Sequence, residues 1–253
     1  MRPIAEIQFV DFIWPAFHQI VGEAARIRYG TNGQMHVPLV IRSPYGGPVR
    51  GGLYHSQSVE GFFHHAPGLK IVCPSTPYDA KGLLKAAIRD DDPVLFFEHK
   101  KSYRLIRGEL PEEDYVLPIG VADVKRSGQD VSVISYGMTL HHCLEAAERL
   151  AEEGVSVEVL DLRTIKPLDR QGIVAAATKT GRVLIVHEDN LTGGVGAEVG
   201  AIVAEDALFH LDAPVMRLCG PDLPAMPYAP TLVDAFYPGT EKIVEALRTL
   251  TSN

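Results

Sequence analysis

Short apolar runs alternate with stretches of helical spacing along the first half of the chain. The runs have the length of β-strands and cover residues 3–9, 37–43, 69–75 and 94–100. Helical patterns lie over residues 17–27 and after Thr76, which is placed to cap a helix whose first position is Pro77. Almost continuously apolar strands that alternate with helices predict a parallel sheet covered on both faces.

The second half repeats this alternation after an irregular stretch. Residues 105–120 contain two prolines and four acidic residues without a sustained period, which indicates an interdomain linker. A clean amphipathic helix follows over residues 140–151, with Gly154 as its stop signal, and the last helix begins at about Thr240. The strands of this half are expected over residues 130–137, 156–164, 182–188 and 214–220. We therefore predict two doubly wound α/β domains, 1–107 and 121–253, joined by a linker over 108–120.

The first strand begins two residues from the start of the chain and its sequence predicts burial on both faces. An open parallel sheet seldom starts at its centre. We therefore expect that the fold is truncated at its N-terminal side.

Composition excludes several classes of protein. The 253 residues are 46% hydrophobic and 22% charged, with no apolar run long enough to span a membrane, and the first residues do not resemble a signal peptide. Twenty-four basic against 32 acidic residues give a net charge of −8, which argues against binding to nucleic acid or to a membrane surface. Three cysteines without CxxC spacing indicate buried thiols in a reducing compartment, and we expect the cytoplasm.

The densest candidate for chemistry covers residues 42–68, directly after a predicted parallel strand. Ligand sites of α/β sheets lie at this end of the strands, and the glycines of the segment permit close approach of the backbone to a ligand. His55 is expected at the start of a helix, where the positive end of the helix dipole favours a neutral, proton-accepting imidazole. Local packing of His55 explains its position equally well.

Two further motifs have weaker implications. Residues 191–200 contain Gly194 and Gly196 after a strand, as in a phosphate-binding turn, but the spacing of the third glycine favours a simple tight turn between strand and helix. The run of three aspartates at 90–92 is predicted to be a solvated helix end, because successive residues point in different directions.

Several motifs together resemble one enzyme family. QFVDF (8–12), YHSQS (54–58) and DLRTIKPLD (161–169) are similar to segments of the β subunits of thiamine-diphosphate-dependent 2-oxo acid dehydrogenases, and the similarity extends over the whole chain. FFEHKKSYR (96–104) and GPDLPAMPYAP (220–230) resemble the branched-chain type more than the pyruvate or acetoin types.

The resemblance implies a pyrimidine-binding domain followed by a transketolase C-terminal domain, in an α2β2 heterotetramer. There the α subunit holds Mg²⁺ and the diphosphate of thiamine diphosphate, and the β subunit receives the aminopyrimidine ring. The implied reaction is oxidative decarboxylation of a 2-oxo acid, with transfer of the acyl group to the lipoyl group of an acyltransferase. Phe12 matches the aromatic residue that stacks on the pyrimidine, and Gln8 is expected to line the same pocket. His55 matches the histidine of reductive acylation, in which an imidazole can pass a proton to a dithiolane sulfur.

The resemblance also implies a structural monovalent cation, such as K⁺, bound by backbone carbonyls. The matching residues are Val37, Leu39, Val40, Ala87, Asp90 and Asp92. Carbonyl ligands leave no side-chain signature, so this expectation depends on the resemblance alone.

One departure from the family concerns the cofactor. The family begins with a segment that carries a GEDVG-like motif, whose glutamate activates the pyrimidine ring, and the similarity here starts after it. Glu6 does not lie at the matching position, so we expect little activity from this chain alone. Two alternatives stay open: a truncated, non-catalytic paralogue that serves as an assembly module, and a nucleotide-binding protein that uses the Gly194–Gly200 turn.

Overall fold

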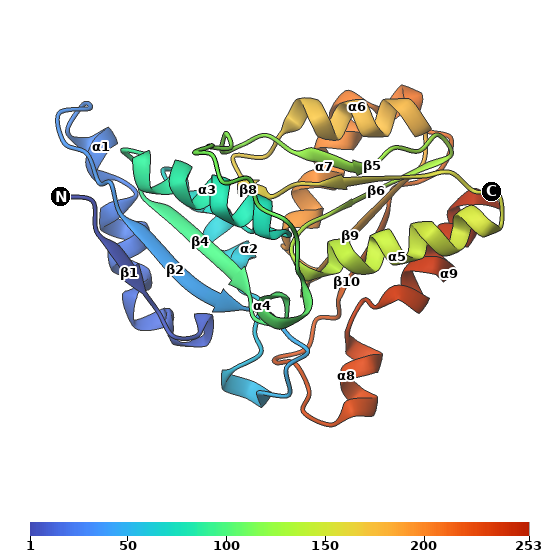
Figure 1. Cartoon of the computed structure of the whole chain (residues 1–253), viewed down its shortest axis with the longest axis horizontal. Helices are drawn as coiled ribbons and strands as arrows, with labels where there is room; N and C mark the ends of the chain where they lie inside the picture. The colour runs from blue at the N-terminus through green and yellow to red at the C-terminus, as the bar shows by residue number, and fades with distance from the viewer. Residues whose placement is uncertain (253) are drawn as a thin grey trace.

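The computed structural model describes residues 1–252 as two α/β units, each built on a five-stranded sheet (Figure 1). The first sheet has the strand order β1 (Ile4–Glu6), β2 (Val40–Tyr45), β4 (Val94–His99), β3 (Lys70–Val72) and β8 (Thr164–Lys166). The second has the order β10 (Met216–Gly220), β9 (Val183–Asn190), β6 (Val131–Ser135), β7 (Val157–Asp161) and β5 (Asp123–Arg126). All neighbouring strands are parallel except at β8 and β5. The predicted fold class is confirmed, whereas the two antiparallel edge strands have no counterpart in the prediction.

Helices cover both faces of each sheet. In the second unit, α5 and α9 pack on one face and α6 and α7 on the other; in the first, α3 covers one face, and α2 with the segment before α1 covers the other. The helices are α1 (Ile27–Gly30), α2 (Glu60–His64), α3 (Pro77–Arg89), α4 (Ser102–Leu105), α5 (Met138–Glu152), α6 (Arg170–Thr180), α7 (Val195–Asp206), α8 (Pro230–Phe236) and α9 (Thr240–Thr251).

Helix α3 shows how sequence and packing agree. The hydroxyl of Thr76 accepts a hydrogen bond from the N–H of Asp79 at 3.2 Å, and Pro77 opens the helix, as predicted. Leu83 and Ala87 then pack against Phe96 and the apolar side chains of neighbouring strands. Full burial of a leucine stabilises a fold by about 2 kcal/mol, so this stripe fixes α3 to the sheet.

The two units share one hydrophobic core. It joins Ile71 and Phe97 of the first sheet to Ile134 and Leu160 of the second, through Ile165 of β8. Strand β8 comes from the second half of the chain but pairs with β3 of the first sheet, with Ile71 opposite Lys166. The first sheet is therefore completed by residues beyond position 120.

Residues 108–120 form neither helix nor strand, yet they are tied to α3. The N–H of Leu117 donates to the carbonyl of Gly82 at 3.2 Å, and the ring of Tyr115 stacks on Tyr78 with centroids 4.6 Å apart. The domain limits at 107 and 121 stay a prediction.

Two details of the predicted elements are wrong. Strand β1 is exposed along its length instead of buried on both faces, because it lies at the edge of the sheet with β2 as its one neighbour. His55 does not begin a helix. It follows a 3₁₀ turn (Gly52–Tyr54), and α2 starts five residues later, at Glu60.

Candidate functional site

Three aromatic rings meet where β1 and β2 end. Phe9 precedes and Phe12 ends a 3₁₀ turn (Val10–Phe12) that follows β1, and His55 comes from the turn after β2. The ring centroid of His55 lies 4.7 Å from that of Phe9 and 5.5 Å from that of Phe12, both edge to face. The structure thus brings together Phe12 and His55, which are 43 positions apart in the sequence, and adds Phe9 to them.

This ring cluster of Phe9, Phe12 and His55 is open on one side. Phe12 is 47% exposed, whereas Phe9 and His55 are half-buried. An exposed ring edge or face on a rigid turn can stack with a planar heterocycle. Gly51 permits the close turn, because a Cβ atom at this position would lie 2.5 Å from the Cβ of His55.

A buried ion pair lies beside the ring cluster. The ammonium of Lys100 donates to the carbonyl oxygen of His55 at 2.6 Å and stands 5.2 Å from the ring centroid of Phe9. Asp11 Oδ2 lies 4.0 Å from the same ammonium, and Asp11 Oδ1 accepts from the N–H of Gln57 at 3.3 Å. Burial lowers the pKa of Lys100, and the carboxylate of Asp11 opposes this change. The pattern of the sequence does not reveal this pair, because both residues sit among ordinary strand and turn positions.

Gln8 lies outside the ring cluster. Its side chain is exposed between β1 and Phe9, and no hydrogen bond or ring contact within residues 1–252 ties it to Phe12 or His55.

The two segments expected around a monovalent cation lie side by side. The N–H of Val37 donates to the carbonyl of Asp91 at 3.0 Å, which joins the irregular segment before β2 to the residues that follow α3. The carbonyls of Val37 and Leu39 each accept one internal hydrogen bond, and that of Asp90 accepts from the Arg2 guanidinium at 2.6 Å. A carbonyl oxygen has a second lone pair, so these groups retain capacity for a cation.

The aspartate carboxylates of this region are occupied by basic side chains. Asp90 pairs with Lys70 at 2.6 Å, Asp91 with Arg2 at 2.6 Å and Asp92 with Arg28 at 2.8 Å. Within residues 1–252 no group of three His, Cys, Asp or Glu side chains is arranged to hold a metal ion. A cation here would therefore depend on backbone carbonyls.

A second polar cluster lies between the two units. Glu188 of β9 accepts hydrogen bonds from the N–H of Gly47 at 2.9 Å and the hydroxyl of Ser58 at 2.7 Å, and its other oxygen is 3.1 Å from Nε2 of His99. Burial alone would raise the pKa of Glu188, but His99 and these donors hold the pKa below its usual value. Asp189 accepts from the N–H of Gly61 at 2.9 Å. The only sequence signal for this cluster is a pair of acids at the end of an apolar strand.

The turn at 191–200 is held by contacts with the protein itself. The N–H of Gly196, in the first turn of α7, donates to Nε2 of His187 at 3.0 Å. A Cβ atom at Gly194 would lie 2.3 Å from the carbonyl oxygen of Asn190. These glycines allow a tight turn against β9 and leave the N–H of Gly196 unavailable to a phosphate, so the nucleotide-binding alternative loses its support.

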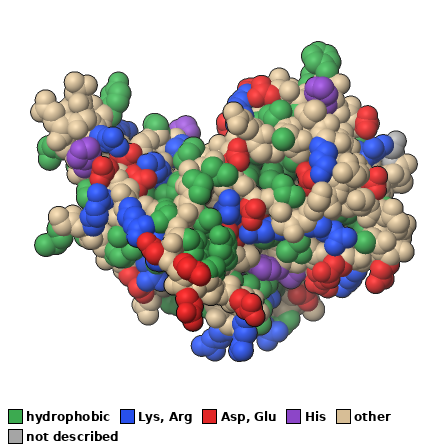
Figure 2. Space-filling model, turned by 45° about the horizontal axis from the view of Figure 1, so that its top comes forward, with side chains coloured by type: hydrophobic (Ala, Val, Ile, Leu, Met, Phe, Trp, Pro, Cys, Tyr) green, Lys and Arg blue, Asp and Glu red, His purple; other side chains and the backbone are tan. Residues whose placement is uncertain are grey.

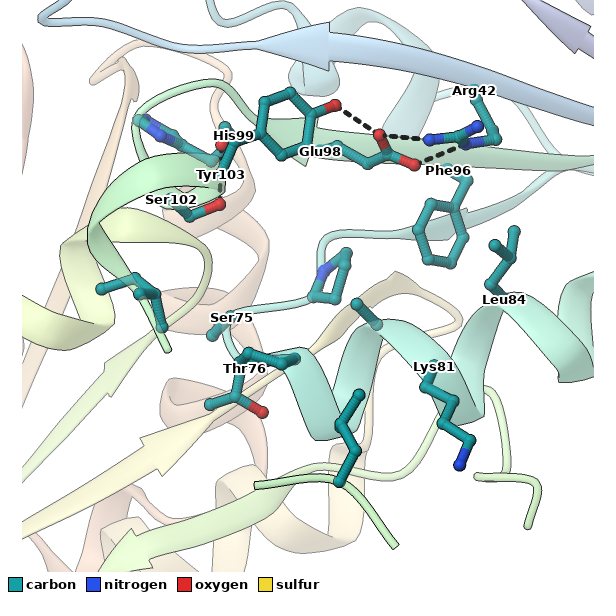
Figure 3. A pocket seen from close by; sticks show the side chains of 15 residues that line it. Arg42, Ser75, Thr76, Lys81, Leu84, Phe96, Glu98, His99, Ser102 and Tyr103 are labelled. Atoms are coloured by element: carbon teal, nitrogen blue, oxygen red, sulfur yellow. Dashed lines mark hydrogen bonds and ion pairs between the residues drawn. The ribbon is translucent and has the colours of Figure 1, made fainter. Parts of the chain in front are cut away.

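An apolar cavity of about 410 Å³ lies between α3, α4 and the sheet (Figure 3). On one wall the guanidinium of Arg42 binds both carboxylate oxygens of Glu98, at 2.6 and 2.9 Å, and the hydroxyl of Tyr103 donates to the same carboxylate. Phe96, from the same strand as Glu98, lies beside this pair, and Leu84 of α3 faces the cavity from the helix. The guanidinium of Arg42 and the carboxylate of Glu98 therefore neutralise each other on this wall.

The surface has no single dominant charge on the face drawn in Figure 2, where acidic and basic side chains are interspersed between apolar patches. No helix within residues 1–252 has the length and apolar character needed to cross a membrane.

Comparison with known proteins connects the fold to a family. Residues 1–106 match the model of the transketolase pyrimidine binding domain, and residues 120–243 match that of the transketolase C-terminal domain. A solved structure described as "Split gene transketolase, inactive beta4 tetramer" has the same fold, with a TM-score of 0.78 at 23% identity over 99% of this chain and 76% of that one.

Curated relatives are much closer in sequence. The chain is 62% identical to the 2-oxoisovalerate dehydrogenase subunit beta of Bacillus subtilis, over 99% of this chain and 76% of the relative. It is 48% identical to the pyruvate dehydrogenase E1 component subunit beta of the same organism, over 87% and 68%. It is 49% identical to the mitochondrial 2-oxoisovalerate dehydrogenase subunit beta of Dictyostelium discoideum, over 93% and 63%. The chain therefore belongs to the family of β subunits of the thiamine-diphosphate-dependent 2-oxo acid dehydrogenases.

Proposed function

We propose that this chain is the β subunit of the decarboxylating component of a branched-chain 2-oxo acid dehydrogenase. The preference for a branched-chain substrate rests on the 62% identity to the 2-oxoisovalerate relative, against 48% to the pyruvate relative. In this proposal the chain works in an α2β2 heterotetramer and passes the acyl group to a lipoyl-bearing acyltransferase. The observation that carries the proposal is the ring cluster of Phe9, Phe12 and His55, which is open on the side of Phe12.

The ring cluster fits an aromatic heterocycle. Phe12 would stack on the aminopyrimidine ring of thiamine diphosphate, and Gln8 would line the same pocket from the neighbouring turn. We place Mg²⁺ and the diphosphate on the α subunit. When bound, the cofactor supplies the electron sink for loss of CO₂ from the 2-oxo acid. Phe9 and Phe12 contribute apolar surface that excludes water from that chemistry.

His55 would act in the transfer to the lipoyl group. As the S–S bond of the dithiolane opens, one sulfur takes the acyl carbon and the other needs a proton. An imidazole N–H of His55 can supply that proton, and a positioned acid of this kind accelerates a reaction by about 10²- to 10⁴-fold.

A monovalent cation would join the start of β2, with the segment before it, to the end of α3 and the residues that follow it. The carbonyls of the six residues named for it would be the ligands: Val37, Leu39, Val40, Ala87, Asp90 and Asp92. Support comes from the bond between Val37 and Asp91, which already brings the two segments together. A higher melting temperature in KCl than in choline chloride of equal ionic strength would support the site, and equal temperatures would contradict it.

We also propose a cytoplasmic location, because the three cysteines are unpaired and thiols persist in a reducing compartment. The limits 1–107 for the pyrimidine-binding domain, 108–120 for the linker and 121–253 for the C-terminal domain complete the proposal.

The test combines this chain with the α subunit of a 2-oxoisovalerate dehydrogenase, thiamine diphosphate and Mg²⁺. We expect reduction of an artificial electron acceptor with 3-methyl-2-oxobutanoate, less with pyruvate, and acylation of an isolated lipoyl domain. His55→Ala should retain acceptor reduction but lose acylation, whereas His36→Ala, an exposed histidine away from the ring cluster, should retain both. A stable complex with α that turns over no 2-oxo acid would overturn the catalytic proposal and favour an assembly role.

A further inference from the structure

Lys100 is a buried ammonium with an unusual position. It directly follows β4, and its side chain is 8% exposed. Among residues 1–252, its ammonium donates one hydrogen bond, to the carbonyl oxygen of His55. A buried ammonium with a single strong acceptor costs free energy, because water would offer it three. This cost has to be offset by other contacts of the ammonium or by a role in function.

The ammonium and Asp11 connect three segments that are distant in sequence. Lys100 reaches the carbonyl of His55 and lies over the ring of Phe9, while its backbone N–H is held by the carbonyl of Tyr45 at 3.0 Å. Asp11, with a side chain 2% exposed, accepts from Gln57, two residues after His55. The pair therefore anchors the His55 turn at two adjacent points, the carbonyl of His55 and the N–H of Gln57.

The turn that carries His55 has little regular structure of its own. It contains a 3₁₀ turn of three residues and is closed by a bond from the N–H of Gly51 to the hydroxyl of Ser56 at 3.0 Å. Its glycines leave the backbone many alternative conformations. The position of the imidazole thus depends on anchors outside the turn, and Lys100 and Asp11 are two of them.

We propose that Lys100 and Asp11 are positioning residues for His55, which fix the imidazole against Phe9 and Phe12 for proton transfer to the lipoyl group. This inference rests on the proposed function for its catalytic consequence, but its structural part concerns the His55 turn alone. A displacement of about 1 Å at a reacting group can reduce a rate by about 100-fold. Decarboxylation would be spared, since it does not use the His55 imidazole in this assignment.

The test compares Lys100→Met with Lys101→Met. Both variants remove one ammonium from neighbouring positions, but Lys101 lines a different cavity, with His142, and no hydrogen bond, ion pair or ring contact among residues 1–252 joins its side chain to the ring cluster. In the α2β2 complex we expect Lys100→Met to lower acylation of the lipoyl domain by about 10- to 100-fold and to leave acceptor reduction within about twofold. A purely structural defect would lower both rates together, so equal losses would overturn the proposal, as would full acylation by Lys100→Met.

A second measurement needs no catalytic activity. Amide hydrogen exchange over residues 53–60 should be about 10-fold faster in Lys100→Met than in the unmodified chain, because one hydrogen bond and one ion pair are lost. Lys101→Met should leave the exchange unchanged. If the unmodified complex turns over no 2-oxo acid, the proposed function fails, and unchanged exchange in Lys100→Met would separately reject the positioning role.

Discussion

The carboxylate of Glu188, on β9 of the second sheet, lies 3.1 Å from Nε2 of His99, at the end of β4 in the first sheet. Both side chains are almost fully buried. The same carboxylate accepts from Gly47 and Ser58, which lie on either side of His55 in the sequence. One acid of the second unit therefore anchors the segment that carries His55 through a backbone N–H at Gly47 and a hydroxyl at Ser58.

Glu188→Ala should lower the free energy of unfolding by about 3 kcal/mol, because it leaves buried donors and the His99 ring without their acceptor. Glu188→Gln keeps an acceptor oxygen and should lose less. Denaturation by guanidinium chloride measures both values, with the exposed Glu241→Ala as control. A loss below about 1 kcal/mol for Glu188→Ala would show that the cluster does not stabilise the contact between the units.

The buried carboxyl of Asp161 should make the free energy of unfolding depend on pH. Burial raises the pKa of Asp161 to about 7, although the ammonium of Lys125 opposes this change. A folded-state pKa above the unfolded value means that this group's stabilisation is complete below about pH 4 and is lost as the pH rises through 7, up to about 4 kcal/mol in total. Asp161→Asn cannot ionise, so its unfolding free energy should change less between pH 5 and pH 8.

The matched control is Asp234→Asn, an exposed aspartate whose replacement should leave the pH dependence as it is. An equally steep pH dependence in Asp161→Asn would assign the effect to another group.

Substitutions of Phe12 and Phe63 should have different effects, one on cofactor binding and the other on the free energy of unfolding. Phe63 is fully buried, and Phe63→Ala should cost about 3–5 kcal/mol of unfolding free energy. Phe12 is 47% exposed, so Phe12→Ala should cost less than about 1 kcal/mol. If Phe12 stacks on the pyrimidine, the apparent KM for thiamine diphosphate in the α2β2 complex should rise about 10-fold. An unchanged KM would remove Phe12 from the cofactor site.

The three cysteines should be unreactive in the folded chain. Burial raises the pKa of Cys143 and of Cys219 to about 12, and that of Cys73 is also raised by burial. At pH 8 a thiol with such a pKa is ionised in about one molecule in ten thousand, and the thiolate is the reactive form. Ellman's reagent should detect none of them within minutes in buffer and all three in denaturant. Rapid labelling of Cys219 in buffer would contradict the packing around His187.

Two glycines near the start of the chain should respond oppositely to alanine. Gly68 has φ of +91°, and a Cβ atom there would lie 2.0 Å from the carbonyl oxygen of Ala25. Gly68→Ala should therefore lower the melting temperature by several degrees, at a cost of more than about 1 kcal/mol. Nothing lies within 4 Å of a Cβ atom at Gly30, so Gly30→Ala should be neutral or slightly stabilising. Similar melting temperatures for the two variants would contradict the close contact between Gly68 and Ala25.

Local signals in the sequence predict local structure well. Thr76 and Pro77 mark the start of α3, and Gly154, with φ of +84°, lies two residues after the end of α5. The apolar runs locate the central parallel strands such as β4, because these strands are buried on both faces. Phe12 and His55 are found through their motifs, since no spacing rule brings positions 43 apart into contact.

Features that depend on tertiary contacts are not predicted. The predicted strand over 156–164 includes only the first residue of β8; the structure ends this strand, β7, at Asp161 and pairs Thr164–Lys166 with the first sheet. The role of Glu188 depends on donors more than 100 positions away, Gly47 and Ser58. The exposed position of β1 follows from its place in the strand order, which hydrophobicity alone does not specify.

The placement of β8 has a mechanical consequence. Many two-unit enzymes close over a substrate by rotating one unit against the other about a connecting segment. Here a strand of the second unit is hydrogen-bonded into the first sheet, and one apolar core extends across both. Such a rotation would have to break the ladder between β3 and β8 and open the shared core, so we expect the two units to move together. We therefore expect a substrate to be admitted by movement of surface loops and not by rotation of one unit against the other.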